Sequence, residues 1–145
     1  MVIDPSGSPA SGSPAVTRQV QIFLISEGTG AVGCGDEVVG VNREIPATSA
    51  VLRGALDLLL NERSQYYGQS GLYNALYQSN LRVQSITRVG NVWTINLTGT
   101  LQLGGACDAP RVAEQLRQTA MQFATVRDVR FTINGVDLDT ALSTR

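Results

Sequence analysis

Two amphipathic helical segments constrain the fold of this chain more than any other feature. Their apolar stripes consist of Leu52, Ala55, Leu56 and Leu59 in the first segment and of Ala113, Leu116, Ala120 and Phe123 in the second. The polar face of the second segment holds Arg111, Glu114, Gln115, Arg117, Gln118 and Gln122. A helix that is apolar on one side only must bury that side, so both helices are expected to lie against a sheet.

Both helix starts carry capping residues. Thr48 or Ser49 can cap the first helix, which we expect to continue to about Glu62. Asp108 is a favourable N-cap for the second helix, and Pro110 falls in the first turn, where a missing N–H has no cost.

The other periodic segments alternate apolar and polar residues, as β-strands do. They span residues 16–26, 38–45, 81–89, 92–103 and 126–133. The first is apolar on both faces, which predicts a position inside the sheet. Gly90-Asn91 predicts a hairpin, and Asn134-Gly135 is the strongest short turn signal in the chain. The order β-β-α-β-β-α-β therefore predicts an α+β two-layer sandwich, in which a mixed or antiparallel sheet of about five strands carries two helices on one face.

Two absent residue types exclude most catalytic mechanisms. The chain has no histidine, and its eleven basic residues are all arginine. Without histidine and lysine there is no Ser-His-Asp triad, Cys-His pair, imidazole metal ligand, phosphate-loop lysine or Schiff base. We therefore expect no catalytic residue, no cofactor and no metal site.

Charge and hydropathy narrow the classes of partner. The formal net charge is −1, and no run of like charges forms a stripe for nucleic acid. No apolar run approaches the about 18 residues of a membrane span, and the first residues lack the pattern of a signal peptide. Residues 1–15 are rich in Ser, Gly and Pro and are expected to form a disordered linker before a single domain over residues 16–145.

Three segments carry a family resemblance. They are TSAVLRGALDLLL, VWTINLTGTLQL and RVAEQLRQTAMQFATVRDVRFTINGVDL, which resemble a first helix, a central strand, and a Gln- and Thr-bearing helix followed by a strand and an Asn-Gly turn. Together they resemble the GerMN domain, the sporulation and spore-germination domain of bacterial extracytoplasmic proteins, many of them lipoproteins. The resemblance covers roughly Arg18 to Leu142.

The resemblance implies an extracytoplasmic domain with no known chemistry, in a family sometimes compared with small α/β modules that assemble into rings across spore membranes. It also implies that the linker is a tether to a lipid-modified cysteine that is absent from this sequence, so that the domain would meet the membrane only through an upstream anchor. The expected partner is another envelope protein or a second copy of the domain. Some members have two copies of the domain where this sequence has one, which weakens a direct transfer of the germination role.

Cys34 and Cys107 lie in loops among small residues. An even number of cysteines in an exported chain indicates one disulfide. This disulfide would close a loop of about 74 residues and stabilise the fold by roughly 4 kcal/mol on the chain-entropy model. The alternative is two free, buried cysteines, and a redox function lacks the C-x-x-C spacing.

Carboxylates offer two further alternatives. Asp36 and Glu37 in one cysteine loop, with Asp108 beside the other cysteine, could approach a cation. Calcium needs six or more oxygen ligands, so solvated loop carboxylates are the simpler interpretation. A glycosidase needs two carboxylates about 5 to 9.5 Å apart, for which the candidates are Glu62, Glu114, Asp36 and Glu37.

All four tyrosines lie in RSQYYGQSGLYNALYQ, residues 63–78. On a short helix, the second half of this segment would present one apolar edge formed by Leu72, Tyr73, Leu76 and Tyr77. That spacing assigns at least the two leucines to the core.

The first half of the tyrosine segment differs, because Tyr66 and Tyr67 follow a helix end in a polar loop. An aromatic face with a hydroxyl tip can stay partly exposed there. With Gln65 and Gln69, the two tyrosines form a candidate surface for a sugar or a protein, unless they only cap the open end of the sheet.

We therefore expect a non-enzymatic interaction or scaffold domain, held outside the cytoplasm at the cell surface. The alternative from a different class is a module that binds cell-wall glycan, namely peptidoglycan, through Tyr66, Tyr67 and the two glutamines. A carboxylate-based glycosidase is the third hypothesis.

Overall fold

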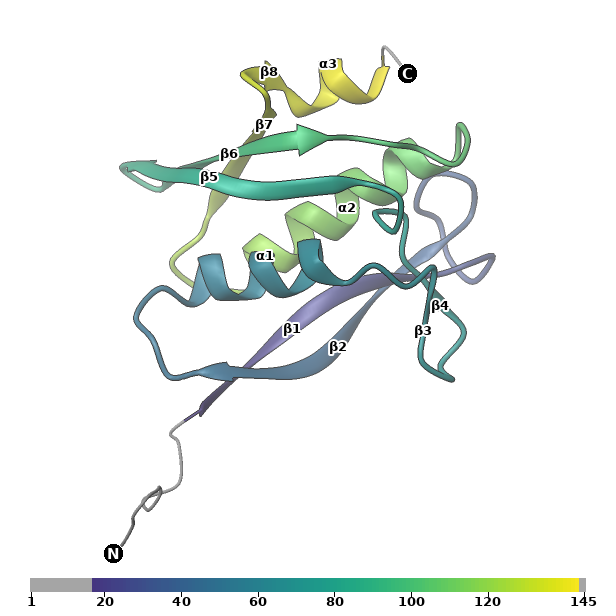
Figure 1. Ribbon diagram of the computed structural model, residues 1–145, viewed down its shortest axis with the longest axis horizontal. Helices are drawn as coiled ribbons and strands as arrows, with labels where there is room; N and C mark the ends of the chain where they lie inside the picture. Colours follow the sequence, from purple (N-terminus) through teal and green to yellow (C-terminus); the bar gives the residue numbers. More distant parts are fainter. Residues whose placement is uncertain (1–16, 144–145) are drawn as a thin grey trace, which may run out of the picture.

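The structure is a computed structural model that describes residues 17–143 (Figure 1). Its strands are β1 (Thr17–Ser26), β2 (Glu37–Pro46), β3 (Tyr66–Tyr67), β4 (Leu72–Tyr73), β5 (Asn80–Val89), β6 (Val92–Thr100), β7 (Asp128–Ile133) and β8 (Val136–Asp137). Its helices are α1 (Val51–Asn61), α2 (Asp108–Met121) and α3 (Leu138–Ser143). The segment expected to be a linker, residues 1–15, lies outside the described residues.

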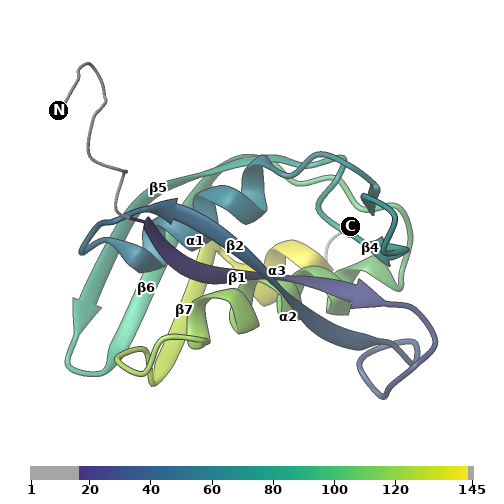
Figure 2. The ribbon, with the colours of Figure 1, turned by 90° about the horizontal axis from the view of Figure 1, so that it is seen from below.

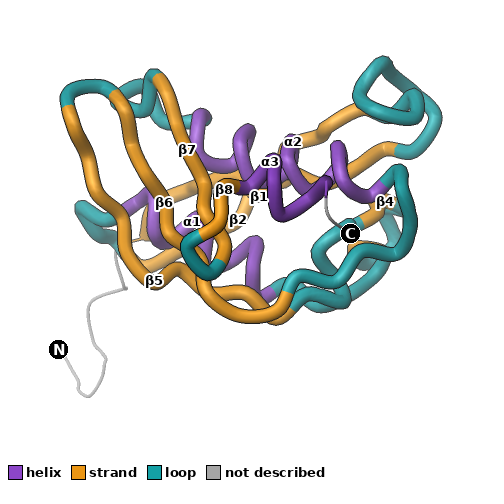
Figure 3. The backbone as a smooth tube through the Cα atoms, turned by 90° about the horizontal axis from the view of Figure 1, so that it is seen from above, coloured by secondary structure: helices purple, strands orange, loops and turns teal. Residues whose placement is uncertain are grey.

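The strands form two four-stranded sheets with the orders β2-β1-β4-β3 and β5-β6-β7-β8. Helix α1 contacts β1 and β5, and α2 contacts β1, β2 and β7, so both helices lie between the two sheets. Figures 1 and 2 show this layering from two directions, and Figure 3 shows the same helices flanked by strands. The predicted α+β sandwich is confirmed. It differs in detail, because the strands are divided between two sheets where one sheet of about five strands was expected.

Strand β1 is the centre of the first sheet, as its two apolar faces predict. It pairs with β2 in one uninterrupted antiparallel ladder from Thr17↔Pro46 to Ser26↔Glu37. Its other edge is closed mainly by α2, because the Gln122 side chain accepts from the Gln21 N–H at 2.8 Å and donates to the Gln21 carbonyl at 2.7 Å. Thr119 Oγ1 also accepts from the N–H of Phe23 at 3.2 Å. Side chains of a helix therefore satisfy this edge as a neighbouring strand would.

The second sheet contains the predicted turns. β5 and β6 form an antiparallel hairpin, and β6 and β7 pair in parallel across α2. Asn134 and Gly135 turn β7 back into β8 with φ angles of 52° and 83°, as their sequence predicts. The Asn134 side chain also binds both the N–H and the carbonyl of Gly99 at 3.1 and 2.8 Å, which extends the pairing of β7 with β6 by one residue.

The apolar stripes of both helices are buried as predicted, with Phe123 half-buried. One residue assigned to the polar face of the second helix was placed wrongly, because Gln115 is fully buried. Its side-chain amide bonds the backbone N–H of Ala75 and the side chain of Asn74, both in the tyrosine segment. The spacing of apolar residues cannot reveal such contacts. No helix among the described residues is both long and apolar enough to cross a membrane.

Both expected caps differ from the structure. Helix α1 begins at Val51 without a side-chain cap, although Thr48 Oγ1 accepts from the N–H of Ala50 at 3.0 Å just before it. Asp108 is the first residue of α2 and does not cap it. Its carboxylate instead accepts from the N–H of Gly104 at 2.8 Å, since buried partners outside the helix compete for it.

Candidate functional site

The tyrosine segment folds as a small hairpin and not as the short helix that its spacing predicted. Tyr66 and Tyr67 form β3, Leu72 and Tyr73 form β4, and Tyr73 pairs with Ile25 at the end of β1. Gly68 and Gly71 take φ angles of 54° and 78° in the connecting turn, which a glycine adopts without strain. Pairing with β1 explains why strand geometry prevails over the helical spacing.

Two buried amides fix this hairpin to the helices. Gln115 of α2 accepts from the N–H of Ala75 at 2.9 Å and donates to Asn74 Oδ1 at 3.2 Å. Asn74 in turn donates to the carbonyl of Glu62, one residue after α1, at 2.7 Å. Because both amides are fully buried, each hydrogen bond satisfies a group that water cannot reach. The backbone that carries the tyrosines is therefore held to both helices.

The second half of the tyrosine segment belongs to the core. Leu76 is buried, and Leu72 and Tyr77 pack half-buried against the core. Tyr73 is 6% exposed, and its ring contacts those of Tyr66 and Tyr77 at centroid distances of 5.7 and 6.1 Å. The two leucines lie in the core as expected.

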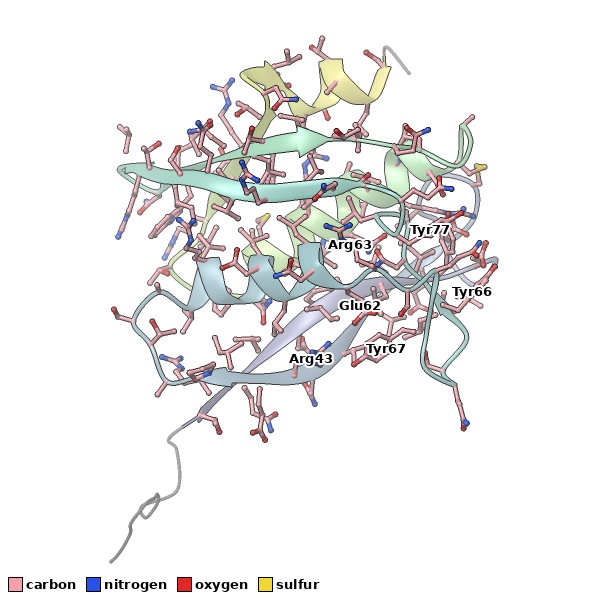
Figure 4. All side chains as sticks on the ribbon, viewed as in Figure 1. Arg43, Glu62, Arg63, Tyr66, Tyr67 and Tyr77 are labelled. Atoms are coloured by element: carbon pink, nitrogen blue, oxygen red, sulfur yellow. A yellow bond between two sulfur atoms is a disulfide. The ribbon has the colours of Figure 1, made fainter. Side chains whose placement is uncertain are left out.

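The four residues singled out as a binding surface lie together on and beside β3. Gln65 and Gln69 are exposed, Tyr66 is 49% exposed, and Tyr67 is half-buried. Figure 4 shows Tyr66 at the right-hand side of the molecule and Tyr67 nearer to Arg43. A ligand for these four side chains stays a prediction.

Arg43 adds a charged group that the sequence did not bring to this surface. Its guanidinium lies 6.0 Å from the centroid of the Tyr67 ring and donates to the Tyr67 hydroxyl at 3.4 Å. It also pairs with Glu62 at 3.6 Å. The half-buried Tyr67 ring therefore lies beside a positive and a negative charge, next in sequence to the exposed Tyr66. We call Gln65, Tyr66, Tyr67, Gln69 and Arg43 the tyrosine surface.

A second polar cluster is formed by residues that lie near the disulfide in the sequence. Cys34 and Cys107 are joined, with their Cα atoms 5.7 Å apart, and the bond links the β1–β2 loop to the start of α2. Asp36 lies two residues beyond Cys34, and Asp108 directly follows Cys107. Both carboxylates are buried, at 1% and 2% exposure, so neither is a solvated loop residue as expected.

Arg111 neutralises both buried carboxylates. Its Nε lies 2.7 Å from Asp36 Oδ2, and its Nη1 lies 3.1 Å from Asp108 Oδ1. The hydrogen bond from Arg111 holds the pKa of Asp36 below its ordinary value, against the opposing effect of burial. Glu27 approaches the same guanidinium at 3.5 Å, so the cation that the acidic residues attract is an arginine. We call Asp36, Asp108 and Arg111 the arginine cluster.

Tyr73 connects the arginine cluster to the tyrosine segment. Its hydroxyl donates to Asp108 Oδ2 at 2.9 Å, and the Arg111 guanidinium lies 5.2 Å from its ring centroid. Burial, followed by the bond to Asp108, raises the pKa of the Tyr73 phenol. The phenol therefore stays protonated and serves as a buried donor. The spacing of Asp108 and Arg111 on one helix was the only signal in the sequence for this cluster.

The other carboxylates considered for a glycosidase are engaged by different partners and do not form a pair across a cleft. Glu62 pairs with Arg43, Glu114 pairs with Arg117 at 3.8 Å, and Glu37 accepts from Thr29 Oγ1 at 3.2 Å. A pocket of about 620 Å³ is lined by Leu101, Gln102, Leu103, Gly105, Ala106, Ala109 and Leu142. None of these lining side chains is ionisable. Among residues 17–143, no group of three or more acidic, cysteine or histidine side chains could hold a metal ion.

Comparison with known proteins agrees with this architecture. A family model described as "Germane: Sporulation and spore germination" matches residues 21–139. The first GerMN domain of the sporulation protein GerM from Bacillus subtilis has a TM-score of 0.56 and 15% identity, over 81% of this chain and 85% of that chain. The tandem GerMN domains of the same protein give a TM-score of 0.63 and 14% identity, over 90% of this chain. No curated protein sequence matches this one.

The chain covers 43% of the tandem structure, so it spans less than half of that relative. At these identities, the likeness to the two solved structures shows a shared fold. The family model is stronger evidence, since its match runs from β1 into α3. The chain therefore belongs to the Germane family of sporulation and spore-germination domains, as its GerMN-like segments predicted.

Proposed function

We propose that this domain is a non-enzymatic interaction domain that works outside the cytoplasm of a bacterium, as part of a surface-tethered protein. Membership of a sporulation and spore-germination family is the observation that carries the proposal. Its partner is another protein of the cell envelope, bound at the tyrosine surface.

The disulfide supports the extracytoplasmic location. Such bonds persist in oxidising compartments and are rare in the cytosol. The Cys34–Cys107 bond joins two segments 73 residues apart, and Arg111 joins the same two segments through its bond to Asp36. It has no second pair of cysteines with which to exchange electrons.

The polar groups of the site support a function in binding over one in catalysis. A general acid or base must reach a substrate and exchange a proton with it. Asp36 and Asp108 are instead buried and occupied by Arg111, and Tyr73 is held as a donor to Asp108. The exposed groups of the tyrosine surface are an aromatic ring, two amides and an arginine, and aromatic residues and arginine are enriched in protein interfaces.

The geometry of Tyr66 suits it as the anchor of such an interface. Its ring is 49% exposed on one side and rests on the Tyr73 ring on the other. A ring held in place before binding loses little conformational entropy when a partner covers it. Arg43 and Glu62, which lie at the neighbouring Tyr67, offer charges of both signs to a polar rim.

Site-specific photo-crosslinking in the native bacterium tests the proposal. A photoreactive amino acid replaces Tyr66 in the full-length protein, and the matched control carries it at Val136, which is 43% exposed on the other sheet. We expect a discrete crosslinked species from position 66 that contains a second envelope protein, and none from position 136. Equal crosslinking from both positions would contradict a binding surface at Tyr66.

Peptidoglycan binding is the second candidate, supported by the exposed Tyr66 ring and the exposed amides of Gln65 and Gln69 near it in the sequence. Aromatic faces flanked by amides suit a sugar ring, which presents an apolar face and a rim of hydroxyls. Amide NMR spectra with and without soluble peptidoglycan fragments distinguish the two. Shifts at residues 65–69 that disappear in Tyr66→Ala would establish a glycan site, whereas unchanged spectra at millimolar fragment would leave a protein partner.

A further inference from the structure

Strand β2 is the long sheet edge that the described part of the chain leaves open. The other outer strands are β3 and β8, with two residues each, and β5. β5 is interrupted by a bulge between Val83 and Ser85, and Arg53 donates to its Val83 carbonyl at 3.0 Å. β2 has ten residues and no register shift, and it lies at the lower rim of the molecule in Figure 1. Within residues 17–143, no side chain binds its outer backbone groups.

The hydrogen bonds of β1 show which groups of β2 point outward. Gln21 and Phe23 direct their backbone groups to α2, so their neighbours Val20, Ile22 and Leu24 direct theirs to β2. The residues opposite those neighbours are Arg43, Val41 and Val39. The backbone groups of the alternate residues, Val38, Gly40, Asn42 and Glu44, therefore face away from β1.

An open row of backbone donors and acceptors is a template for another strand, and soluble proteins usually blunt such edges. We propose that a second copy of this domain docks antiparallel on β2, so that the two four-stranded sheets join into one continuous sheet. This inference rests on the proposed interaction function and adds a self-association surface along β2, which shares Arg43 with the tyrosine surface.

The side chains of β2 favour its own copy as the added strand. With Gly40 opposite the partner's Gly40, Glu37 lies opposite the partner's Arg43, and Val39 lies opposite the partner's Val41. Two-fold symmetry forms each pair twice. Opposite charges and β-branched residues across a ladder both stabilise the pairing. Moving the register by one allowed step places Val41 opposite the partner's Val41, Glu37 opposite Ile45 and Val39 opposite Arg43. The Glu37–Arg43 pair therefore forms in the first register and not in this one.

The surroundings of these residues are compatible with docking. Glu37 is exposed, and Val39 and Val41 are half-buried, so each valine leaves apolar surface for a neighbour to cover. The Arg43 side chain keeps 32% of its surface exposed while it pairs with Glu62. A net charge of −1 per chain adds little repulsion between copies.

A charge-exchange experiment tests the surface and its register together. Glu37→Arg makes both contacts Arg–Arg, and Arg43→Glu makes both Glu–Glu, so each variant alone should dimerise at least about fivefold more weakly than the wild type. In an equimolar mixture of the two variants, a mixed dimer again has one arginine facing one glutamate at each contact, so the mixture should recover association. Sedimentation equilibrium of the folded, oxidised domain gives the dissociation constants. Asp137→Arg on β8 is the control with the same change in charge as Glu37→Arg, and it should associate as the wild type does.

A second variant tests the backbone pairing. Asn42→Pro removes an outward N–H and leaves the inward bonds of β2 to β1 in place, so it should stay folded by circular dichroism and become monomeric. Asn42→Ala is its control and should still associate. A wild-type domain that stays monomeric at about 1 mM, or a mixture that associates no better than its components, would overturn the inference.

The two proposals fail separately. If the domain is monomeric but still crosslinks to an envelope protein through position 66, only the β2 interface is ruled out. If the domain dimerises through β2 but gives no specific crosslink at position 66, only the tyrosine surface is ruled out as a binding site.

Discussion

Arg111 is the residue on which most of the buried polar structure depends. It reaches Asp36 across 75 positions of sequence and Asp108 within its own helix, and both carboxylates are almost completely buried. Removing one partner of a buried ion pair leaves a charge without compensation, which costs far more than the pair itself contributes. The hydrogen bonds that the guanidinium donates to Asp36 and then to Asp108 raise its pKa, which favours its charged form.

The first prediction compares two arginines of α2. Arg111→Met should lower the free energy of unfolding by about 3 to 5 kcal/mol, because it leaves Asp36 and Asp108 buried and unpaired. Arg117→Met is the matched control, since Arg117 is 37% exposed and its pairs with Glu114 and Asp139 lie at the surface. That change should cost at most about 1 kcal/mol. Urea unfolding measures both, and equal losses would contradict the importance of the arginine cluster.

The second prediction concerns acid. The pKa of Asp36 is lowered in the folded state, mainly by its bond to Arg111, so its contribution to stability is complete above the ordinary aspartate pKa of about 3.9. That contribution is lost as the pH falls through the lower folded pKa. Asp57, whose pKa is raised by burial, contributes with the opposite sign.

Urea unfolding as a function of pH measures this effect. The wild type should lose stability progressively as the pH falls below about 4. Arg111→Met should show a smaller loss, because its Asp36 has no cation to keep it ionised. Parallel pH profiles for the two proteins would contradict the assignment to Asp36.

At the scale of elements, local sequence signals predicted local structure well. The Asn134-Gly135 turn, the place of β1 and the buried stripes of both helices follow from neighbours a few residues apart. The hairpin of β3 and β4 could not be predicted in this way. Its strand geometry depends on Ile25 and its attachment depends on Gln115, which lie 48 and 42 positions from Tyr73. Asp108 looked like a cap in part for the same reason, since its bond to Tyr73, 35 positions away, is invisible to a local pattern.

The candidate site was predicted in part for the same physical reason. The exposed position of Tyr66 followed from the polar residues around it, and the burial of Leu76 followed from its spacing. Arg43 joined the surface only because β2 runs beside β1 in space, while β4 pairs with the other edge of β1.

The third prediction concerns the link between the β1–β2 loop and α2. Replacing both Cys34 and Cys107 by serine should lower the free energy of unfolding by up to about 4 kcal/mol, because the bond closes a loop across 73 positions. The contact of Asp36 with Arg111 remains in this variant, so the domain should stay folded. Urea unfolding with and without reductant measures the loss. The prediction would be contradicted if the reductant left the free energy of unfolding of the wild type unchanged. Two free thiols in the unreduced, unfolded wild type would also contradict it.

At the scale of the whole molecule, two helices are enclosed between two sheets, and the functional groups lie at one end. Tyr73 connects the arginine cluster and the tyrosine hairpin there, since it contacts β1, Asp108 and Tyr66. An end whose parts are joined in this way and that presents Tyr66 suits the proposed docking on a partner. The open edge of β2 offers a second proposed surface, which shares Arg43 with the first.

The most direct test of the account is the thiol and protease state of the native protein in intact cells. In the first assay, cell proteins are denatured without reduction and then treated with a thiol-alkylating reagent of high mass. In the second, spheroplasts of the same cells are exposed to external protease. We predict that the protein gains mass from the reagent only after it has been reduced. We also predict that the external protease degrades it while cytoplasmic proteins stay intact. A protein alkylated at both Cys34 and Cys107 before reduction, and protected from the protease, would place the domain in the cytoplasm and contradict the account.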